Sequence, residues 1–121
     1  MKRILIVEDQ ADIRKLIRLT LEFEAYEIHE ARDGGEGLAQ AQALQPDVVL
    51  LDVMMPGALD GLALCRLLKS RAPAPLVVLL TARGQPSDLE AGRAAGADDY
   101  LVKPFSPLQL IDTVERLTAM A

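Results

Sequence analysis

Aromatic residues, cysteine and long apolar stretches are all scarce in this sequence. The 121 residues include two Tyr, two Phe and no Trp, so the core has to be aliphatic, although half of the residues are hydrophobic. The single cysteine, Cys65, excludes an internal disulfide and favours a cytoplasmic protein. No apolar run approaches the roughly 18 residues that a membrane span needs. The apolar run at residues 4–7 is too short for a signal peptide.

Positive charge is also in short supply, with 13 Lys and Arg against 18 Asp and Glu and a formal net charge of −5. An acidic surface repels phosphates, so the sequence predicts no direct nucleic-acid binding, and it offers no segment for a membrane. The length fits one domain with its own core, and no linker, repeat or low-complexity segment divides it.

Strand patterns occur five times along the chain. Residues 4–7, 48–51 and 76–80 are continuous apolar runs, which suit strands buried on both faces of a sheet. Residues 26–31 alternate between apolar and polar, which suits a strand at the sheet edge, and residues 100–102 form a short fifth strand.

Helical patterns fill the gaps between these strands. They are centred on residues 13–21, 38–41, 62–68, 86–95 and 107–117. The fourth is weak, because Gly92 costs about 1 kcal/mol relative to alanine inside a helix. Gly96 and Ser106 are expected to cap the fourth and fifth helices. The alternation predicts an α/β protein with a three-layer (βα)5 flavodoxin-like fold and a parallel sheet of order 2-1-3-4-5.

Ionisable and hydroxyl side chains follow four of the strands. Glu8 and Asp9 come after the first strand, Asp52 after the third, Thr81 after the fourth and Lys103 after the fifth. Sites in open parallel sheets form at the carboxyl ends of the strands, so these side chains are expected to share one rim.

This rim predicts a magnesium site and a nucleophile. Three carboxylates so close repel one another, and Mg²⁺ prefers oxygen ligands, so we expect Asp9 and Asp52 to be direct ligands and Glu8 to act through water. An ionised Asp52 can attack phosphorus, while Lys103 and Thr81 balance the charge on the phosphoryl oxygens.

The motifs at the strand ends have a specific order and spacing. They are Val7-Glu8-Asp9, Leu51-Asp52 with Met55-Pro56, Leu80-Thr81-Ala82, Gly96-Ala97-Asp98-Asp99-Tyr100 and Val102-Lys103-Pro104-Phe105. Together they resemble the signatures of response-regulator receiver domains, over essentially the whole chain. The resemblance implies that residues 1–121 are one receiver domain. Because the chain ends soon after Leu117, we expect no output domain within it, whether it is a stand-alone regulator or a fragment of a longer one. It also implies that Asp52 accepts a phosphoryl group from a histidine kinase or a phosphotransfer protein.

The same resemblance implies roles for further residues. Met54 would lend its backbone carbonyl to the metal, and the Lys103–Pro104 bond would be cis. Thr81 and Tyr100 match the switch pair of the family, in which the hydroxyl moves toward the phosphate and the ring turns inward.

One loop departs from the family pattern. The family usually has two residues between its Met-Pro and Asp-Gly pairs, whereas Gly57, Ala58 and Leu59 make three here. The path and the contacts of this loop therefore stay open at this point.

Two side chains flank the approach of water to a phosphoryl group on Asp52. They are Met54 and Arg83, which stand two residues after Asp52 and Thr81. Met54 has no group to orient a water molecule, and Arg83 could lie across the opening. We therefore expect slow self-dephosphorylation, in a signalling domain that promotes its own phosphorylation and is not an enzyme.

Three rival functions fit parts of the pattern. A Mg²⁺-dependent phosphatase with an aspartate nucleophile needs a second acid where Met54 stands. A flavin protein needs a Ser/Thr/Gly-rich loop in place of Glu8-Asp9-Gln10. A degenerate receiver is disfavoured by the complete set of site residues. We interpret His29 as a surface residue, Cys65 as a packing residue and Asp12 as a helix-terminal charge.

The fourth helix, fifth strand and fifth helix are expected to carry the phosphorylation signal, because a weak helix suits a moving element. Family members with winged-helix output domains often dimerise here through ion pairs. Asp99 is retained, but Leu89, Gln109 and Thr113 stand where charged partners would be expected. We therefore predict a monomer or a weak dimer.

Overall fold

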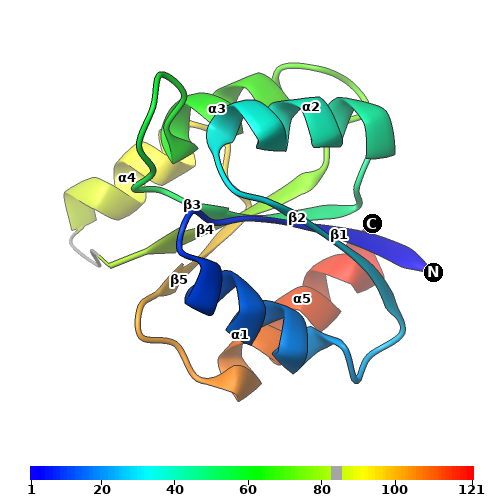
Figure 1. Cartoon of the computed structure of the whole chain (residues 1–121). Helices are drawn as coiled ribbons and strands as arrows, with labels where there is room; N and C mark the ends of the chain where they lie inside the picture. The colour runs from blue at the N-terminus through cyan, green and yellow to red at the C-terminus, as the bar shows by residue number, and fades with distance from the viewer. Residues whose placement is uncertain (83–85) are drawn as a thin grey trace.

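A computed structural model describes residues 1–82 and 86–121 as a central parallel sheet with helices on both faces (Figure 1). The strands are β1 (Lys2–Val7), β2 (Tyr26–Ala31), β3 (Val48–Asp52), β4 (Leu76–Thr81) and β5 (Asp99–Val102). The helices are α1 (Ala11–Leu21), α2 (Gly34–Leu44), α3 (Gly61–Lys69), α4 (Pro86–Ala94) and α5 (Pro107–Met120). The strand order is β2-β1-β3-β4-β5 and every pairing is parallel, so the predicted flavodoxin-like fold is confirmed.

The core lies in two apolar layers, one on each face of the sheet. Successive side chains of a strand point to opposite faces. Leu5 and Val7 of β1 accordingly pack in the layer that contains Leu64 of α3, whereas Ile4 and Ile6 pack in the layer of α1 and α5. Figure 1 shows the same division, with α2 and α3 above the sheet and α1 and α5 below it. The three central strands are the apolar runs of the sequence, as predicted.

The outer edge of β2 is covered by side chains from both neighbouring helices. Ala31 O accepts from Glu8 N at 3.1 Å and therefore points toward β1, so the carbonyls of Ile28 and Glu30 point outward. Arg18 Nη2 of α1 donates to Ile28 O at 3.1 Å, and Gln40 Nε2 of α2 donates to Glu30 O at 2.7 Å. These two outward carbonyls of the edge are thus hydrogen-bonded without a partner strand.

The helix ends follow the sequence closely. Ser106 begins α5 with a capping box, in which its hydroxyl accepts from Gln109 N and the Gln109 side chain accepts from Ser106 N. Gly96 follows α4 with φ +96°, a left-handed conformation that glycine adopts without strain. Within the residues that the structure describes, we find no helix with both the length and the apolar character to cross a membrane.

Candidate functional site

The predicted rim residues do come together at the carboxyl ends of the strands. Glu8 and Asp9 follow β1, Asp52 ends β3, Thr81 ends β4 and Lys103 follows β5. One carboxylate oxygen from each of the three acids lies within 4.8 Å of the other two. Parallel pairing of adjacent strands places these ends side by side, so residues far apart in the sequence form one acidic cluster.

Asp52 is buried at the end of β3, with only 5% of its surface exposed. Its Oδ1 accepts from Met54 N at 3.3 Å and lies 3.5 Å from Lys103 Nζ. The first residue of α3, Gly61, packs against this strand end, because a Cβ there would lie 2.2 Å from Asp52 O. The buried side chain thus has an amide and an ammonium group facing the same carboxylate oxygen.

Glu8 is fully buried, and its carboxylate is bound from two sides. Lys103 Nζ donates to Oε1 at 2.8 Å, and Gln10 N lies 3.4 Å from Oε2. Burial raises the pKa of Glu8 to about 7, Asp52 adds to the rise, and the Lys103 ammonium only partly opposes it. Burial by itself would lower the pKa of Lys103, but the hydrogen bond and charge of Glu8, with the charge of Asp52, raise it.

The donor set of this rim fits a hard divalent cation. Glu8, Asp9 and Asp52 offer oxygen ligands only, and Lys103 is the cation that the structure places among them. When ionised, three carboxylates carry more negative charge than the one Lys103 ammonium balances. Oxygen ligands with access to water are the preference of Mg²⁺. The residues present therefore fit the ion that the sequence predicts.

The two predicted switch residues occupy neighbouring strands. Thr81 is buried at the end of β4, and its carbonyl accepts from Lys103 N at 2.7 Å. The ring of Tyr100 in β5 lies against α4, where a Cβ on Gly92 would approach Tyr100 Cε1 to 3.2 Å. The Lys103–Pro104 bond is cis, as the family resemblance implies.

Gly92 has a packing role that its cost in a helix did not indicate. A Cβ at this position would also lie 2.8 Å from Leu79 Cδ1, which is closer than real side chains allow. Glycine thus lets α4 approach the sheet.

The two predicted gate residues have different outcomes. Met54 stands two residues after Asp52 and is 61% exposed, and its proposed gating role stays a prediction. Arg83 lies outside the described residues. The loop with the extra residue reaches the start of α2, because Leu59 O sits where a Cβ of Gly34 would be, at 2.1 Å. Gly57 has φ +103°, so this turn needs glycine.

The residues interpreted as structural lie away from the rim or inside the core. His29 is on β2 and pairs with Glu27, with Nε2 and Oε2 2.9 Å apart. Cys65 is buried, its thiol donates to Ala95 O at 3.4 Å, and burial raises its pKa to about 11. His29 is thus a partly exposed residue of the edge strand, and the burial of Cys65 confirms it as a packing residue.

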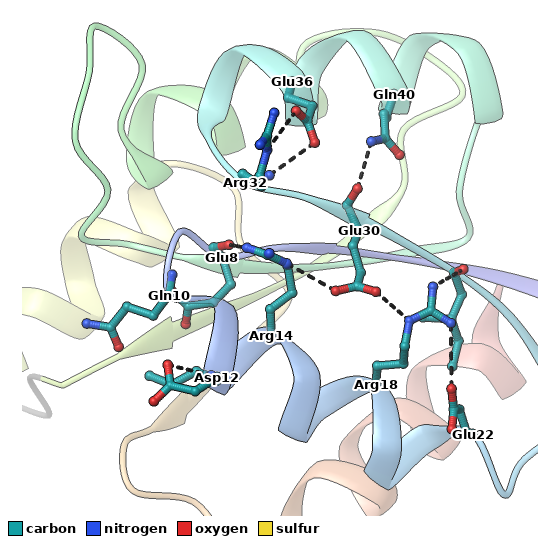
Figure 2. Close-up of polar contacts among 12 residues, drawn as sticks. Glu8, Gln10, Asp12, Arg14, Arg18, Glu22, Glu30, Arg32, Glu36 and Gln40 are labelled. Carbon is teal, nitrogen blue, oxygen red and sulfur yellow. Dashed lines mark hydrogen bonds and ion pairs between the residues drawn. The ribbon is translucent and has the colours of Figure 1, made fainter.

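Sequence reasoning missed a group of residues behind the rim, which Figure 2 shows. Arg14 of α1 donates from Nη1 to the backbone carbonyl of Glu8 at 2.8 Å, and its Nε pairs with Glu30 of β2 at 3.0 Å. Arg18 pairs with the other carboxylate oxygen of Glu30. No sequence pattern predicts the first contact, because a backbone carbonyl is present at every residue.

Comparisons with known proteins agree on one family. Residues 4–115 match the response regulator receiver domain. The transcriptional regulatory protein ResD of Bacillus subtilis is 43% identical over 119 residues, which cover 98% of this chain and 49% of that protein. The response regulator MprA of Mycolicibacterium vanbaalenii is 44% identical over 95% of this chain and 49% of its own length. The chain thus spans about half the length of these curated relatives.

Solved structures give the same result. The chemotaxis protein CheY4 of Vibrio cholerae superposes with a TM-score of 0.88 and 35% identity, over 97% of this chain and 98% of that one. The receiver domain of the Francisella response regulator 1452 superposes with a TM-score of 0.92 and 32% identity, over 99% and 98% of the two chains.

Proposed function

Because this chain belongs to the response regulator receiver domain family, a family of two-component signalling proteins, we propose that Asp52 is its phosphoacceptor. The donor is a phosphohistidine on a histidine kinase or a phosphotransfer protein. The single observation that carries the proposal is the setting of Asp52. A buried carboxylate at a strand end meets the Lys103 ammonium and the Met54 amide at one oxygen, next to two further acids.

The residues of the rim have separate tasks in this transfer. An Asp52 oxygen attacks phosphorus, the phosphorus–nitrogen bond to the donor imidazole breaks, and the electron pair of that bond leaves with the imidazole nitrogen. Lys103 holds positive charge at the Asp52 carboxylate, 3.5 Å from Oδ1. Thr81, at the end of the adjacent strand β4, provides a hydroxyl for a phosphoryl oxygen.

Glu8, Asp9 and Asp52, together with the Met54 backbone carbonyl, would hold Mg²⁺. When bound, the ion supplies the positive charge that offsets the charge of the phosphoryl oxygens. Asp9 and Asp52 are direct ligands in this proposal. Glu8 acts through water, which suits a carboxylate whose Oε1 already accepts from Lys103.

Phosphorylation is communicated through Thr81 and Tyr100 in our proposal. The hydroxyl moves toward the phosphoryl group and the ring of Tyr100 shifts inward against the sheet. The close contact between that ring and Gly92 of α4 supports this path, since movement of the ring changes the surface on which α4 rests. The signal is then read on the face of α4, β5 and α5.

We propose that this face supports at most weak dimerisation, so that the domain is a monomer or a weak dimer. We also propose that the domain makes no direct contact with nucleic acid. Asp99, the charge retained from the ion-paired dimers of the family, pairs within the chain with Arg116 Nη2 at 2.6 Å. Sedimentation with and without beryllofluoride tests this point. A tight, salt-sensitive dimer through α4 and α5 would refute it.

Residues 1–121 act as a receiver domain of the cytoplasm in this proposal, a compartment that suits the buried thiol of Cys65.

The deciding experiment compares wild type, Asp52→Asn and Asp112→Asn, each incubated with acetyl phosphate and Mg²⁺ and weighed intact. We expect phosphorylated wild type and Asp112→Asn, and no phosphorylated Asp52→Asn. Asp112 is an exposed residue of α5 and controls for loss of any one carboxylate. Phosphorylation of Asp52→Asn at the wild-type yield would overturn the assignment.

A further inference from the structure

The turn between β1 and α1 carries Asp9, yet its local sequence does little to hold it. Gln10 occupies the N-cap position of α1 without a side-chain capping hydrogen bond. The contact from Gln10 N to Glu8 Oε2 is long, at 3.4 Å. Repulsion between the carboxylates of Glu8, Asp9 and Asp52 also works against this turn.

Arg14 holds this turn from behind. Its Nη1 donates to Glu8 O at 2.8 Å, and its side chain is only 15% exposed (Figure 2). Glu8 O belongs to the peptide unit that also contains the nitrogen of Asp9. Because that unit is planar, fixing its carbonyl fixes the direction in which Asp9 leaves the strand. A hydrogen bond from a charged donor is among the stronger ones that a backbone carbonyl can accept.

Glu30 fixes Arg14 in turn. The two carboxylate oxygens of Glu30 each take one arginine, Arg14 at 3.0 Å and Arg18 on the other side. The backbone of Glu30 is held as well, since Gln40 Nε2 donates to its carbonyl at 2.7 Å. The guanidinium of Arg14 is therefore bound at both ends, to the turn by Nη1 and to β2 by Nε.

From this geometry we propose that Arg14, held by Glu30, is a positioning residue that sets the Glu8–Asp9 turn for the divalent cation. The inference rests on the proposed metal site at Asp9 and Asp52. Arg14 contacts neither the ion nor the phosphoryl group, and it acts through the peptide unit that carries Asp9. Groups that orient metal ligands in this manner typically change metal affinity about 10- to 100-fold when they are removed.

Arg18 provides a matched control for Arg14. Both arginines extend from α1, both pair with Glu30 and both donate to a backbone carbonyl of the sheet, but Arg18 reaches Ile28 O and not Glu8 O. Arg14→Met and Arg18→Met therefore remove the same charge and the same kind of contact. They differ in whether the turn of Asp9 loses its support.

The direction of the change in Mn²⁺ affinity distinguishes a positioning role of Arg14 from an effect of its charge. Removing a cation near a metal site strengthens cation binding by Coulomb's law. Arg14→Met is nevertheless expected to weaken Mn²⁺ binding about tenfold, whereas Arg18→Met leaves it unchanged or slightly stronger. Arg14→Lys keeps the charge but has a single nitrogen for two acceptors, so we expect an affinity between those of wild type and Arg14→Met.

The test measures Mn²⁺ binding to the full chain by electron paramagnetic resonance, with Mg²⁺ as competitor, and urea unfolding of each variant without metal. Asp9→Ala is included as the variant that removes a ligand. Equal Mn²⁺ affinities for Arg14→Met and Arg18→Met, together with a weaker affinity for Asp9→Ala, would overturn the role of Arg14 and leave the proposed metal site standing. If Asp9→Ala binds as tightly as wild type, the metal site itself is wrong and the inference fails with it.

Discussion

The two sides of the Asp52 rim are built from different kinds of contact. On one side, which we call the metal side, Glu8 and Asp9 leave β1 on a backbone bound by Ala31 O and by Arg14. On the other, the switch side, Tyr100 of β5 meets α4 through apolar contact at Gly92. Hydrogen bonds and ion pairs fix directions, whereas apolar contacts do not. We therefore expect the metal side to be the more rigid half, which would hold the proposed ligands, and the switch side to be the half that moves.

The largest test of this comparison is Asp9→Ala on the metal side. Loss of a direct ligand should weaken Mg²⁺ binding about 100-fold or more, a change of about 2.7 kcal/mol. Calorimetric titration with Mg²⁺ measures it. Asp12→Ala removes an exposed carboxylate from the first turn of α1 and should change the affinity little. An equal loss of Mg²⁺ affinity in both variants would mean that the ion responds to the total negative charge of the region and not to a ligand at Asp9.

The second test uses pH and needs no metal. The pKa of Glu8 is about 7 in the folded protein against 4.5 for an ordinary glutamate, so the folded state binds more protons between these values. The free energy of unfolding should therefore fall as pH rises from about 4.5 to 7 and level off above, by an amount on the order of 2 kcal/mol. Glu8→Gln cannot titrate, and its unfolding energy should lack this decline.

Urea unfolding at pH 5 and pH 8, without divalent cations, gives the comparison. The measured quantity is the difference in unfolding energy between wild type and Glu8→Gln at each pH. Relative to wild type, the variant should gain stability at the higher pH. A difference that is the same at both pH values would show that Glu8 keeps its ordinary pKa.

The third test crowds the switch side. Gly92→Val places a branched side chain where even a Cβ would lie 2.8 Å from Leu79 Cδ1. Overpacking of this kind should destabilise the fold by about 2 kcal/mol and leave Mg²⁺ affinity within a factor of about 2. Ala94→Val, at an exposed position of the same helix, isolates the cost of branching alone. If Gly92→Val weakens Mg²⁺ binding as much as Asp9→Ala, the two sides are not independent.

The smallest expected effect concerns the lifetime of the phosphorylated protein. Met54→Asn combined with Arg83→Glu introduces groups that can orient a water molecule, so the phosphoryl group should be lost about three times faster or more. That ratio corresponds to about 0.7 kcal/mol in activation free energy. The decay of phosphorylated protein after removal of the donor measures it. Met54→Leu fills similar space without a polar group and should decay at the wild-type rate. A double variant no faster than wild type would show that these side chains do not gate water.

Much of this rim could be predicted because strand ends are visible in the sequence. The apolar runs that end at Val7, Leu51 and Leu80 locate the acidic and hydroxyl residues that follow, and parallel pairing brings them together. The observed strand boundaries differ in places from the predicted ones. β1 begins at Lys2 and not at Ile4, because its polar first residues pair with the edge strand β2.

The sequence could not predict two kinds of contact. One is a hydrogen bond to a backbone carbonyl, and the other is a close approach of two segments at a glycine, which has no side chain. The role of Arg14 depends on a carbonyl that carries no sequence signature. The close approach of Leu59 to Gly34, and of α4 to the sheet at Gly92, depends on the space that a Cβ would fill. Each needs the distance between two segments, and hydrophobic periodicity gives only the face on which a residue lies.

The hydrogen bonds from Arg18 and Gln40 to the outer carbonyls of β2 have a consequence for the behaviour of the protein in a crowded cell. An open strand edge is a template onto which a strand of another chain can add, and such addition starts aggregation. Here the acceptors at Ile28 and Glu30 are already occupied by side chains from two helices. A second chain would have to displace both before it could pair, which protects the sheet at the edge nearest its N-terminal strand.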